Sequence, residues 1–135
     1  MSAKKSITTT GKKKSAKARA SIQKGSGKVT INSIPVENWG SFYERNLILE
    51  PMHIMEKALS AVDISINVLG GGSVGQAAAC RVAMARAVIK FTNDDKLKKD
   101  LISYDDKIFS GDSRQKEPCK PNDSSARARR QKSYR

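Results

Sequence analysis

The sequence is poor in the residues that enzymes, metal sites and membrane segments need. Its 135 residues include one histidine, two cysteines and only 5% aromatic residues. Cys80 and Cys119 form no CxxC spacing and His53 has no second histidine nearby, so a structural zinc site with four closely spaced ligands is excluded. No apolar run is long enough to span a membrane, and the start "MSAKKSITTT" lacks the apolar core of a signal peptide.

Acidic residues are also scarce, with 13 Asp and Glu against 26 Lys and Arg. No spacing of these acids places two carboxylates around a reacting bond, and the serines lie mainly in arms and turns. We therefore expect no enzymatic activity, no cofactor and no small-molecule substrate.

Positive charge is abundant, and it is distributed unevenly. The formal net charge is +13, with nine bases and no acid in residues 1–28, nine bases and ten acids in residues 29–110, and eight bases and three acids in residues 111–135. Two cationic arms around a nearly neutral centre indicate a nucleic acid, because each neutralised phosphate releases condensed counterions. Neither arm has the apolar stripe that binding to an anionic membrane needs, and charge for solubility alone explains two arms less well.

The last nine residues, 127–135, contain five Lys or Arg and no acid. Almost nothing in this segment is apolar, so no burial offsets the entropy of ordering it. We expect an extended basic tail over residues 111–135, a basic arm over residues 1–8, and a globular domain over residues 9–110.

Within the domain, strands come first. Ala16, Ala18, Ala20 and Ile22 alternate with polar residues, which predicts a half-buried strand. "SITTTG" upstream is a companion strand, and "KGSG" at residues 24–27 reads as a hairpin turn into a further strand that ends near Pro35.

Helical signals follow, with one more strand among them. The spacing in "GSFYERNLILEPMHIMEKALS" predicts two short helices that meet near Glu50, with Pro51 in the first turn of the second. "DISINVLG" predicts a strand, "VGQAAACRVAMARAVIKF" a long helix with one buried stripe, and "DDKLKKDLISY" a short helix capped by Asn93.

"GGGSVGQ" is the one stretch that suggests an enzyme. Gly70, Gly72 and Gly75 satisfy GxGxxG, and Asp95 follows at the distance a dinucleotide fold requires. That acid opens a helix here, and too little chain remains for the rest of such a sheet. The loop either brings backbone N–H groups to a phosphate or makes a tight turn; Arg86 and Lys90, on the helix face away from the apolar stripe, favour a contact with RNA.

Five motifs in order resemble one family. "TGKKKSAKARA", "LEP", "GGGSVGQAAACRVAMARAVIKF", "YDDKIFSGDSRQKEPCKPN" and the terminal "ARARRQKSYR" are similar to the ninth protein of the small ribosomal subunit, in its archaeal and eukaryotic branch. The resemblance covers about Thr10 to Arg135. It implies an α/β (α+β) fold of two layers, a mostly antiparallel four-stranded sheet with helices on one face and a left-handed crossover, followed by an extended basic tail.

The resemblance also implies partners: small-subunit rRNA in the head, neighbouring ribosomal proteins there, and the anticodon arm of tRNA in the peptidyl site, within the cytoplasmic ribosome. The residues expected to bind tRNA are Lys132, Tyr134 and Arg135. The residues expected to bind rRNA are Lys12, Lys13, Lys14, Lys17, Arg19, Gly70, Gly71, Gly72, Gly75, Gln76, Arg86, Arg114, Lys116, Lys120, Arg127, Arg129 and Arg130.

Two readings from other classes stay open from the residues alone. A free architectural nucleic-acid-binding protein would explain both arms, and a nucleotide-dependent enzyme would explain the glycine loop. Sedimentation with small subunits separates the first from a ribosomal protein, and micromolar binding of a dinucleotide would support the second.

Overall fold

A computed structural model describes residues 6–122, 124–131 and 133–135. The elements, in chain order, are β1 (Ile7–Lys13), β2 (Ala16–Lys24), β3 (Val29–Ile31), β4 (Ile34–Pro35), the 3₁₀ turn η1 (Val36–Asn38), α1 (Phe42–Ile54), α2 (Glu56–Leu59), β5 (Val62–Leu69), α3 (Ser73–Thr92), α4 (Asp95–Tyr104) and α5 (Lys107–Ser110). The expected division placed residues 1–8 outside the domain, whereas β1 begins at Ile7. The last helix ends at Ser110, and no helix or strand follows it among the described residues of the tail.

The sheet has five strands in the order β1-β2-β5-β3-β4. Neighbours are antiparallel except β3 and β5, which are parallel. The expectation of four strands was one too low, because the two-residue strand β4 folds back on β3. Asn32 and Ser33 make this turn with φ of 48° and 68°, the backbone that a two-residue hairpin loop needs.

The predicted hairpin between β2 and β3 is wrong. The connection does turn, but β5 lies between the two strands it joins. Asp63 at the start of β5 holds this connection, because its carboxylate accepts hydrogen bonds from the backbone N–H groups of Ser26 (2.8 Å) and Lys28 (3.0 Å). Glycine and serine signal a turn, but they do not specify which strand will pair with the next one.

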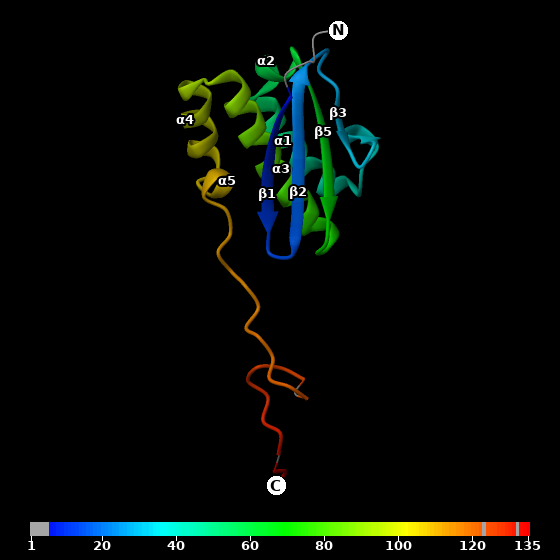
Figure 1. Cartoon of the computed structure of the whole chain (residues 1–135), viewed down its shortest axis with the longest axis vertical. Helices are drawn as coiled ribbons and strands as arrows, with labels where there is room; N and C mark the ends of the chain where they lie inside the picture. Colours follow the sequence, from blue (N-terminus) through cyan, green and yellow to red (C-terminus); the bar gives the residue numbers. More distant parts are fainter. Residues whose placement is uncertain (1–5, 123, 132) are drawn as a thin grey trace.

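The helices cover one face of the sheet, as Figure 1 shows, and the core lies between the two layers. The alternation predicted for β2 is confirmed, since Ala16, Ala18, Ala20 and Ile22 are all buried against this layer. The long helix α3 crosses behind β1, β2 and β5 and is buried over most of its length. Small side chains on both elements let strand and helix approach closely.

The crossover from β3 to β5 passes through α1 and α2. In Figure 1, β5 points down, β3 lies to its right and is parallel to it, and the helices lie behind the sheet. This arrangement makes the connection left-handed, as the resemblance implied and against the usual preference of such units.

Two helix boundaries differ from the sequence prediction. Two helices do form between residues 42 and 59, but they meet at Met55, and Pro51 lies inside α1, where it is buried. Asn93 does not cap α4; it ends α3 in a left-handed conformation with φ of 53°, and Asp94 caps α4 by accepting from the N–H groups of Lys96 and Leu97. Of the described helices, none is long and apolar enough to cross a lipid bilayer.

Candidate nucleic-acid interface

The basic turn predicted from "TGKKKSAKARA" is the two-residue hairpin loop between β1 and β2. Lys13 pairs with Ala16, which leaves Lys14 and Ser15 in the loop. Lys14 has φ of 53°, a backbone region that costs a lysine free energy and suits glycine or asparagine. The Lys14 side chain is exposed at the tip of this loop.

The glycine loop lies directly against this hairpin. Gly70 and Gly71 have φ of 78° and 65°, and a Cβ on Gly70 would come within 2.7 Å of the Ser15 carbonyl oxygen, one on Gly71 within 3.0 Å of the Ala16 backbone nitrogen. The Gln76 side-chain amide donates to the Gly70 carbonyl (3.1 Å) and fixes the loop from inside. The fold itself therefore requires Gly70 and Gly71.

Gly72 and Gly75 have a different environment. A Cβ on Gly72 would meet no atom within 4 Å, and one on Gly75 would lie 3.7 Å from the Ala16 Cβ. Gly72 is the N-cap of α3 with an extended backbone, φ of −96°. Neither packing nor backbone conformation demands glycine at these two positions, which leaves close approach of a ligand as a reason for them.

Sequence reasoning missed a carboxylate at this end of the domain. Glu44 in α1 accepts from the Ser41 N–H (2.8 Å) in a capping box, and a hydrogen bond from the Ser73 hydroxyl, followed by that from the Ser41 N–H, lowers its pKa. Ser73 is the first residue of α3. A negative charge therefore already lies near the positive N-terminus of α3, so the glycine loop is not a simple anion site.

The first residues of the tail, which we call the tail root (residues 112–114), are attached to the same hairpin. Lys13 Nζ lies 2.8 Å from an Asp112 carboxylate oxygen, and the Arg114 guanidinium lies 2.9 Å from the same oxygen. Arg114, and after it Lys13, holds the pKa of Asp112 well below its usual range. The Asp112 side chain is 8% exposed. This cluster fixes where the tail leaves the domain; the sequence signal was the "DSR" motif, of which only the arginine was singled out.

Arg86 is also used within the domain. Its guanidinium donates to the carbonyl oxygens of Thr10 (2.9 Å) in β1 and Phe109 (2.7 Å) in α5. Its expected contact with RNA, from the helix face away from the apolar stripe, stays a prediction. What the structure adds is that Arg86 joins the sheet to the segment from which the tail starts.

Three hollows surround the hairpin loop. One of about 520 Å³ is lined by Lys14, Ser15 and residues 114–116, and another of about 380 Å³ by the hairpin loop and the glycine loop. A third, of about 710 Å³, lies where Lys12, Lys17 and Arg19 meet the end of β5. The hairpin cations, the glycine loop and the start of the tail, predicted as separate segments, thus form one surface, which we call the basic end.

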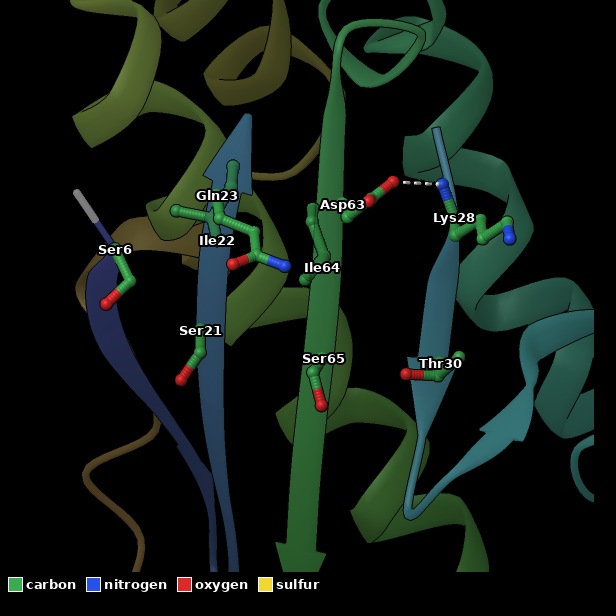
Figure 2. Close-up of a pocket in the computed structure, with 9 residues that line it drawn as sticks. All are labelled: Ser6, Ser21, Ile22, Gln23, Lys28, Thr30, Asp63, Ile64 and Ser65. Carbon is green, nitrogen blue, oxygen red and sulfur yellow. Dashed lines mark hydrogen bonds between the residues drawn. The ribbon is translucent and has the colours of Figure 1, made fainter. Parts of the chain in front are cut away.

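The basic end continues onto the face of the sheet that no helix covers. Strand register aligns the outward side chains in rows: Lys12, Lys17 and Leu69 form one row, and Thr10, Arg19 and Asn67 form the next. Thr8, Ser21, Ser65 and Thr30 form a third row that contains only hydroxyl groups. Figure 2 shows Ser21, Ser65 and Thr30 side by side on the open face.

The rest of the tail extends away from the domain beyond the β1–β2 loop (Figure 1). Arg127 lies 2.9 Å from Glu117, and the Arg130 guanidinium donates to the Pro121 carbonyl (3.2 Å). Tyr134 is 87% exposed. The predicted residues Lys116, Lys120, Arg129 and Arg135 are exposed as well; Lys132 lies outside the described residues.

Among the described residues, no three His, Cys, Asp or Glu side chains gather to hold a metal ion. Burial raises the pKa of the Cys80 thiol to about 12, while Cys119 is exposed in the tail. Asp95 opens helix α4, so the acid of a dinucleotide fold is missing from its required strand end.

Comparison with known proteins agrees with this geometry. The sequence model of the family described as ribosomal protein S9/S16 matches residues 11–135. The protein named small ribosomal subunit protein uS9 from Thermoplasma acidophilum is 47% identical over 129 residues, 96% of this chain and 100% of the relative. Proteins with the same name from Thermoplasma volcanium and Methanococcus maripaludis are 44% and 43% identical, over 96% and 97% of this chain and 98% and 99% of their own. The chain therefore belongs to the ribosomal protein S9 family, whose members are structural components of the ribosome and not enzymes, and its location is the small subunit of the cytoplasmic ribosome.

Proposed function

We propose that the basic end binds rRNA in the head of the small ribosomal subunit, beside neighbouring ribosomal proteins, and that the tail carries its last residues to the anticodon arm of tRNA in the peptidyl site. The observation that supports this most is the meeting of the hairpin loop, the glycine loop and the tail root around Lys14. Three segments far apart in sequence are rich in cations or exposed backbone, and they converge on one surface.

Charge explains why such a surface suits RNA. Lys12, Lys14 and Lys17 are exposed around the loop, and each phosphate they neutralise releases counterions. Glu44 and Asp112, the two acids found at this end, are hydrogen-bonded within the protein. Cations pair with Asp112, whereas Glu44 keeps its negative charge, so the attraction to phosphate comes from the lysines of the hairpin and not from the N-terminus of α3.

Sedimentation tests the rRNA part of the proposal. We expect the variant Lys12→Gln/Lys14→Gln/Lys17→Gln to be depleted from small subunits in a sucrose gradient, because its attraction to three phosphates is weakened at once. The matched control is Lys96→Gln/Lys98→Gln/Lys99→Gln, which removes three exposed lysines from α4. Equal recovery of the two variants with small subunits would refute the basic end, and a wild-type protein that stays at the top of the gradient would favour a free nucleic-acid-binding protein.

The tail has the length that the tRNA part requires. Twenty-four residues follow Gly111, and an extended chain covers up to about 3.3–3.6 Å per residue, so the tip reaches tens of ångströms from the domain. A segment with so few apolar residues forms no core of its own, and it can thread through RNA where a folded domain does not fit. Arg135 presents a planar guanidinium suited to phosphate, and the exposed ring of Tyr134 can stack on a base or a sugar.

Deletion of Ser133–Arg135 tests the tip. We expect subunit assembly to be unchanged and tRNA to dissociate from the peptidyl site a few-fold to about tenfold faster, because charge-assisted contacts are partly offset by the cost of ordering a flexible end. Deletion of Arg127–Arg135 is expected to have a larger effect, because it also removes arginines that anchor the tail to rRNA. The measurement is the rate of tRNA dissociation from purified small subunits that carry each truncation. An unchanged rate in the three-residue deletion would make the tip an rRNA anchor only.

A further inference from the structure

A row of four hydroxyl-bearing side chains crosses the open face of the sheet. Thr8, Ser21, Ser65 and Thr30 lie on β1, β2, β5 and β3 at one level of the register. At about 4.8 Å between strands, the row spans about 14 Å. Thr8 and Ser21 lie within 3.5 Å of each other, and within the described residues the side chains of Ser65 and Thr30 make no hydrogen bond.

A hollow of about 410 Å³ lies over this part of the face, lined among others by Ser21, Thr30 and Ser65 (Figure 2). Gln23 and Lys28 add polar groups at its rim, and Asp63 is its one carboxylate. One Asp63 carboxylate oxygen, Oδ1, accepts from the backbone N–H groups of both Ser26 and Lys28, and Figure 2 shows the bond to Lys28. The hollow thus contains hydroxyl groups and an amide, and its only acid is already hydrogen-bonded.

We propose that this row binds the ribose–phosphate backbone of an RNA strand and recognises its 2′-hydroxyl groups. The proposal rests on the proposed function, since the same face carries Lys17 and Arg19 at the basic end. Serine and threonine hydroxyls both donate and accept hydrogen bonds, as a ribose 2′-hydroxyl does, and that group is what lets a protein distinguish RNA from DNA. The cations provide attraction to any phosphate chain, and the hydroxyl row provides the preference for RNA.

The composition of the face favours RNA backbone over two other occupants. A protein partner would need apolar or aromatic anchors, but Ile22 and Ile64, which line the hollow, are 0% and 2% exposed. Stacked bases would need aromatic side chains, and among the described residues no strand carries one on the open face. Exposed Leu69 lies at the far end of this face, beside Lys17. Around the hydroxyl row itself the face offers uncharged hydrogen-bonding groups beside cations, which matches sugar and phosphate.

The test compares binding of a fluorescent twelve-residue oligouridylate with that of its 2′-deoxy counterpart, by anisotropy, using the full-length protein. We expect the wild type to bind the RNA more tightly. In the variant Thr8→Val/Ser21→Ala/Ser65→Ala/Thr30→Val, RNA affinity should fall about three- to tenfold and the preference should disappear, while the salt dependence stays unchanged because every cation is kept. Valine keeps the branched shape that suits a strand, and a thermal melt checks that the variant is folded.

Two comparisons make the result specific. The control Ser60→Ala/Ser103→Ala removes hydroxyls that bond to carbonyls of their own helices and should leave both affinities unchanged. The variant Lys17→Gln/Arg19→Gln should weaken binding of RNA and DNA alike, which reports on the proposed function separately. The hydroxyl row is overturned if wild type does not distinguish the two strands, or if the four-site variant keeps the preference. Loss of that variant from small subunits with unchanged oligonucleotide binding would also overturn it and make the row a protein contact.

Discussion

Gly11 and Gly72 both border the basic end, but the space around them differs. A Cβ on Gly11 would lie 2.4 Å from the Ala79 carbonyl oxygen and 2.6 Å from the Ala83 nitrogen, both backbone atoms of α3. A Cβ added to Gly72 would have no other atom within 4 Å. One glycine allows the sheet and helix to pack, and the other leaves an open surface.

We therefore expect opposite effects from substitutions at these two glycines. Gly11→Ala should lower the free energy of unfolding by about 2 kcal/mol, because backbone must move to admit the methyl group. Gly72→Val should lower the melting temperature by only the few degrees that a poorer N-cap of α3 costs. It should reduce incorporation into small subunits much more, because the side chain intrudes where RNA approaches. Thermal melts and gradient sedimentation of both variants measure this. An unstable Gly72→Val would mean that the loop only shapes the fold.

Three carboxylates predict how stability depends on pH. Hydrogen bonds from Ser73 and Ser41 lower the pKa of Glu44, those from Lys28 and Ser26 lower that of Asp63, and Arg114 and Lys13 lower that of Asp112. A folded-state pKa below the unfolded value stabilises the protein above the unfolded pKa of about 4, and this stabilisation is lost as pH falls through the folded pKa. We expect the urea midpoint to be level near neutral pH and to fall below about pH 4.

Substitutions identify the carboxylates that cause this pH dependence. Glu44→Gln/Asp63→Asn should lower the urea midpoint at pH 7 and reduce the difference between pH 7 and pH 3. The control Glu37→Gln/Glu56→Gln changes two exposed acids. If the control reduced the pH dependence as much as the first variant, these hydrogen bonds would not be its cause.

At the scale of elements, the sequence predicted what local pattern determines. The alternation in β2 identifies the strand and its buried face, because side chains alternate along a strand. Periodicity also identifies α3 as a helix, but the predicted stripe from Val74 to Ile89 is not its most buried side, since Val74 is 47% exposed while Cys80, Met84 and Val88 are 0% exposed. One neighbour of β2, the upstream strand β1, was predicted correctly. The other was mistaken for β3, because β5 begins 38 residues beyond the end of β2 and local turn signals carry no information about it. Pro51 was misplaced for a related reason: burial inside α1 outweighs the proline's local preference for a helix start.

In the candidate site too, local motifs predicted some residues, whereas others depend on contacts between distant segments. The cations of the basic end were named from motifs in the sequence, and the structure brings Lys14, Gly71 and Arg114 around one loop. Glu44 and Asp112 were not singled out as site residues, although each has one partner close in sequence, Ser41 and Arg114. Only the fold adds their distant partners, Ser73 and Lys13. The hydroxyl row was invisible for a further reason, since it exists only when four strands align in register.

The charge of the tail predicts how RNA affinity depends on salt concentration. Residues 112–135 hold eight bases and three acids. Deleting them should leave a folded domain whose RNA affinity is weaker and whose plot of log K against log salt is shallower, by about 0.9 for each duplex phosphate that the tail had neutralised or about 0.7 for each single-stranded one. Affinity for a small-subunit rRNA transcript over a salt series measures the slope. An unchanged slope would show that the tail does not contact phosphate.

At the scale of the whole molecule, the tail begins beside the surface to which RNA is proposed to bind. Arg86 joins α5 to β1, and Asp112 joins the next residues to Lys13, so two attachments determine the direction in which the tail leaves. A tail that starts at the basic end continues the contact of the domain without crossing its other faces. The folded part and the unfolded part therefore act on one side of the protein.

The position of β5 in the sheet has a consequence for the order of folding. Strand β5 is central, between β2 and β3, yet it is the last strand to be synthesised. Until it arrives, β2 and β3 have no shared partner and each leaves an unpaired edge. We infer that the rate-limiting step of folding is the insertion of β5, since distant pairings incur the entropy of loop closure first.

The same substitution at two buried isoleucines tests this order. Ile66, in the middle of β5, pairs with Ala20 on one side and Ile31 on the other, while Ile108 lies in α5 at the edge of the fold; both are 0% exposed. Each Ile→Val change should cost about 1 kcal/mol. In stopped-flow denaturant series, Ile66→Val should mainly slow folding and Ile108→Val should mainly accelerate unfolding. If both changes acted on unfolding alone, β5 would join a sheet nucleus that had already formed, and the central strand would be the last part of the domain to close.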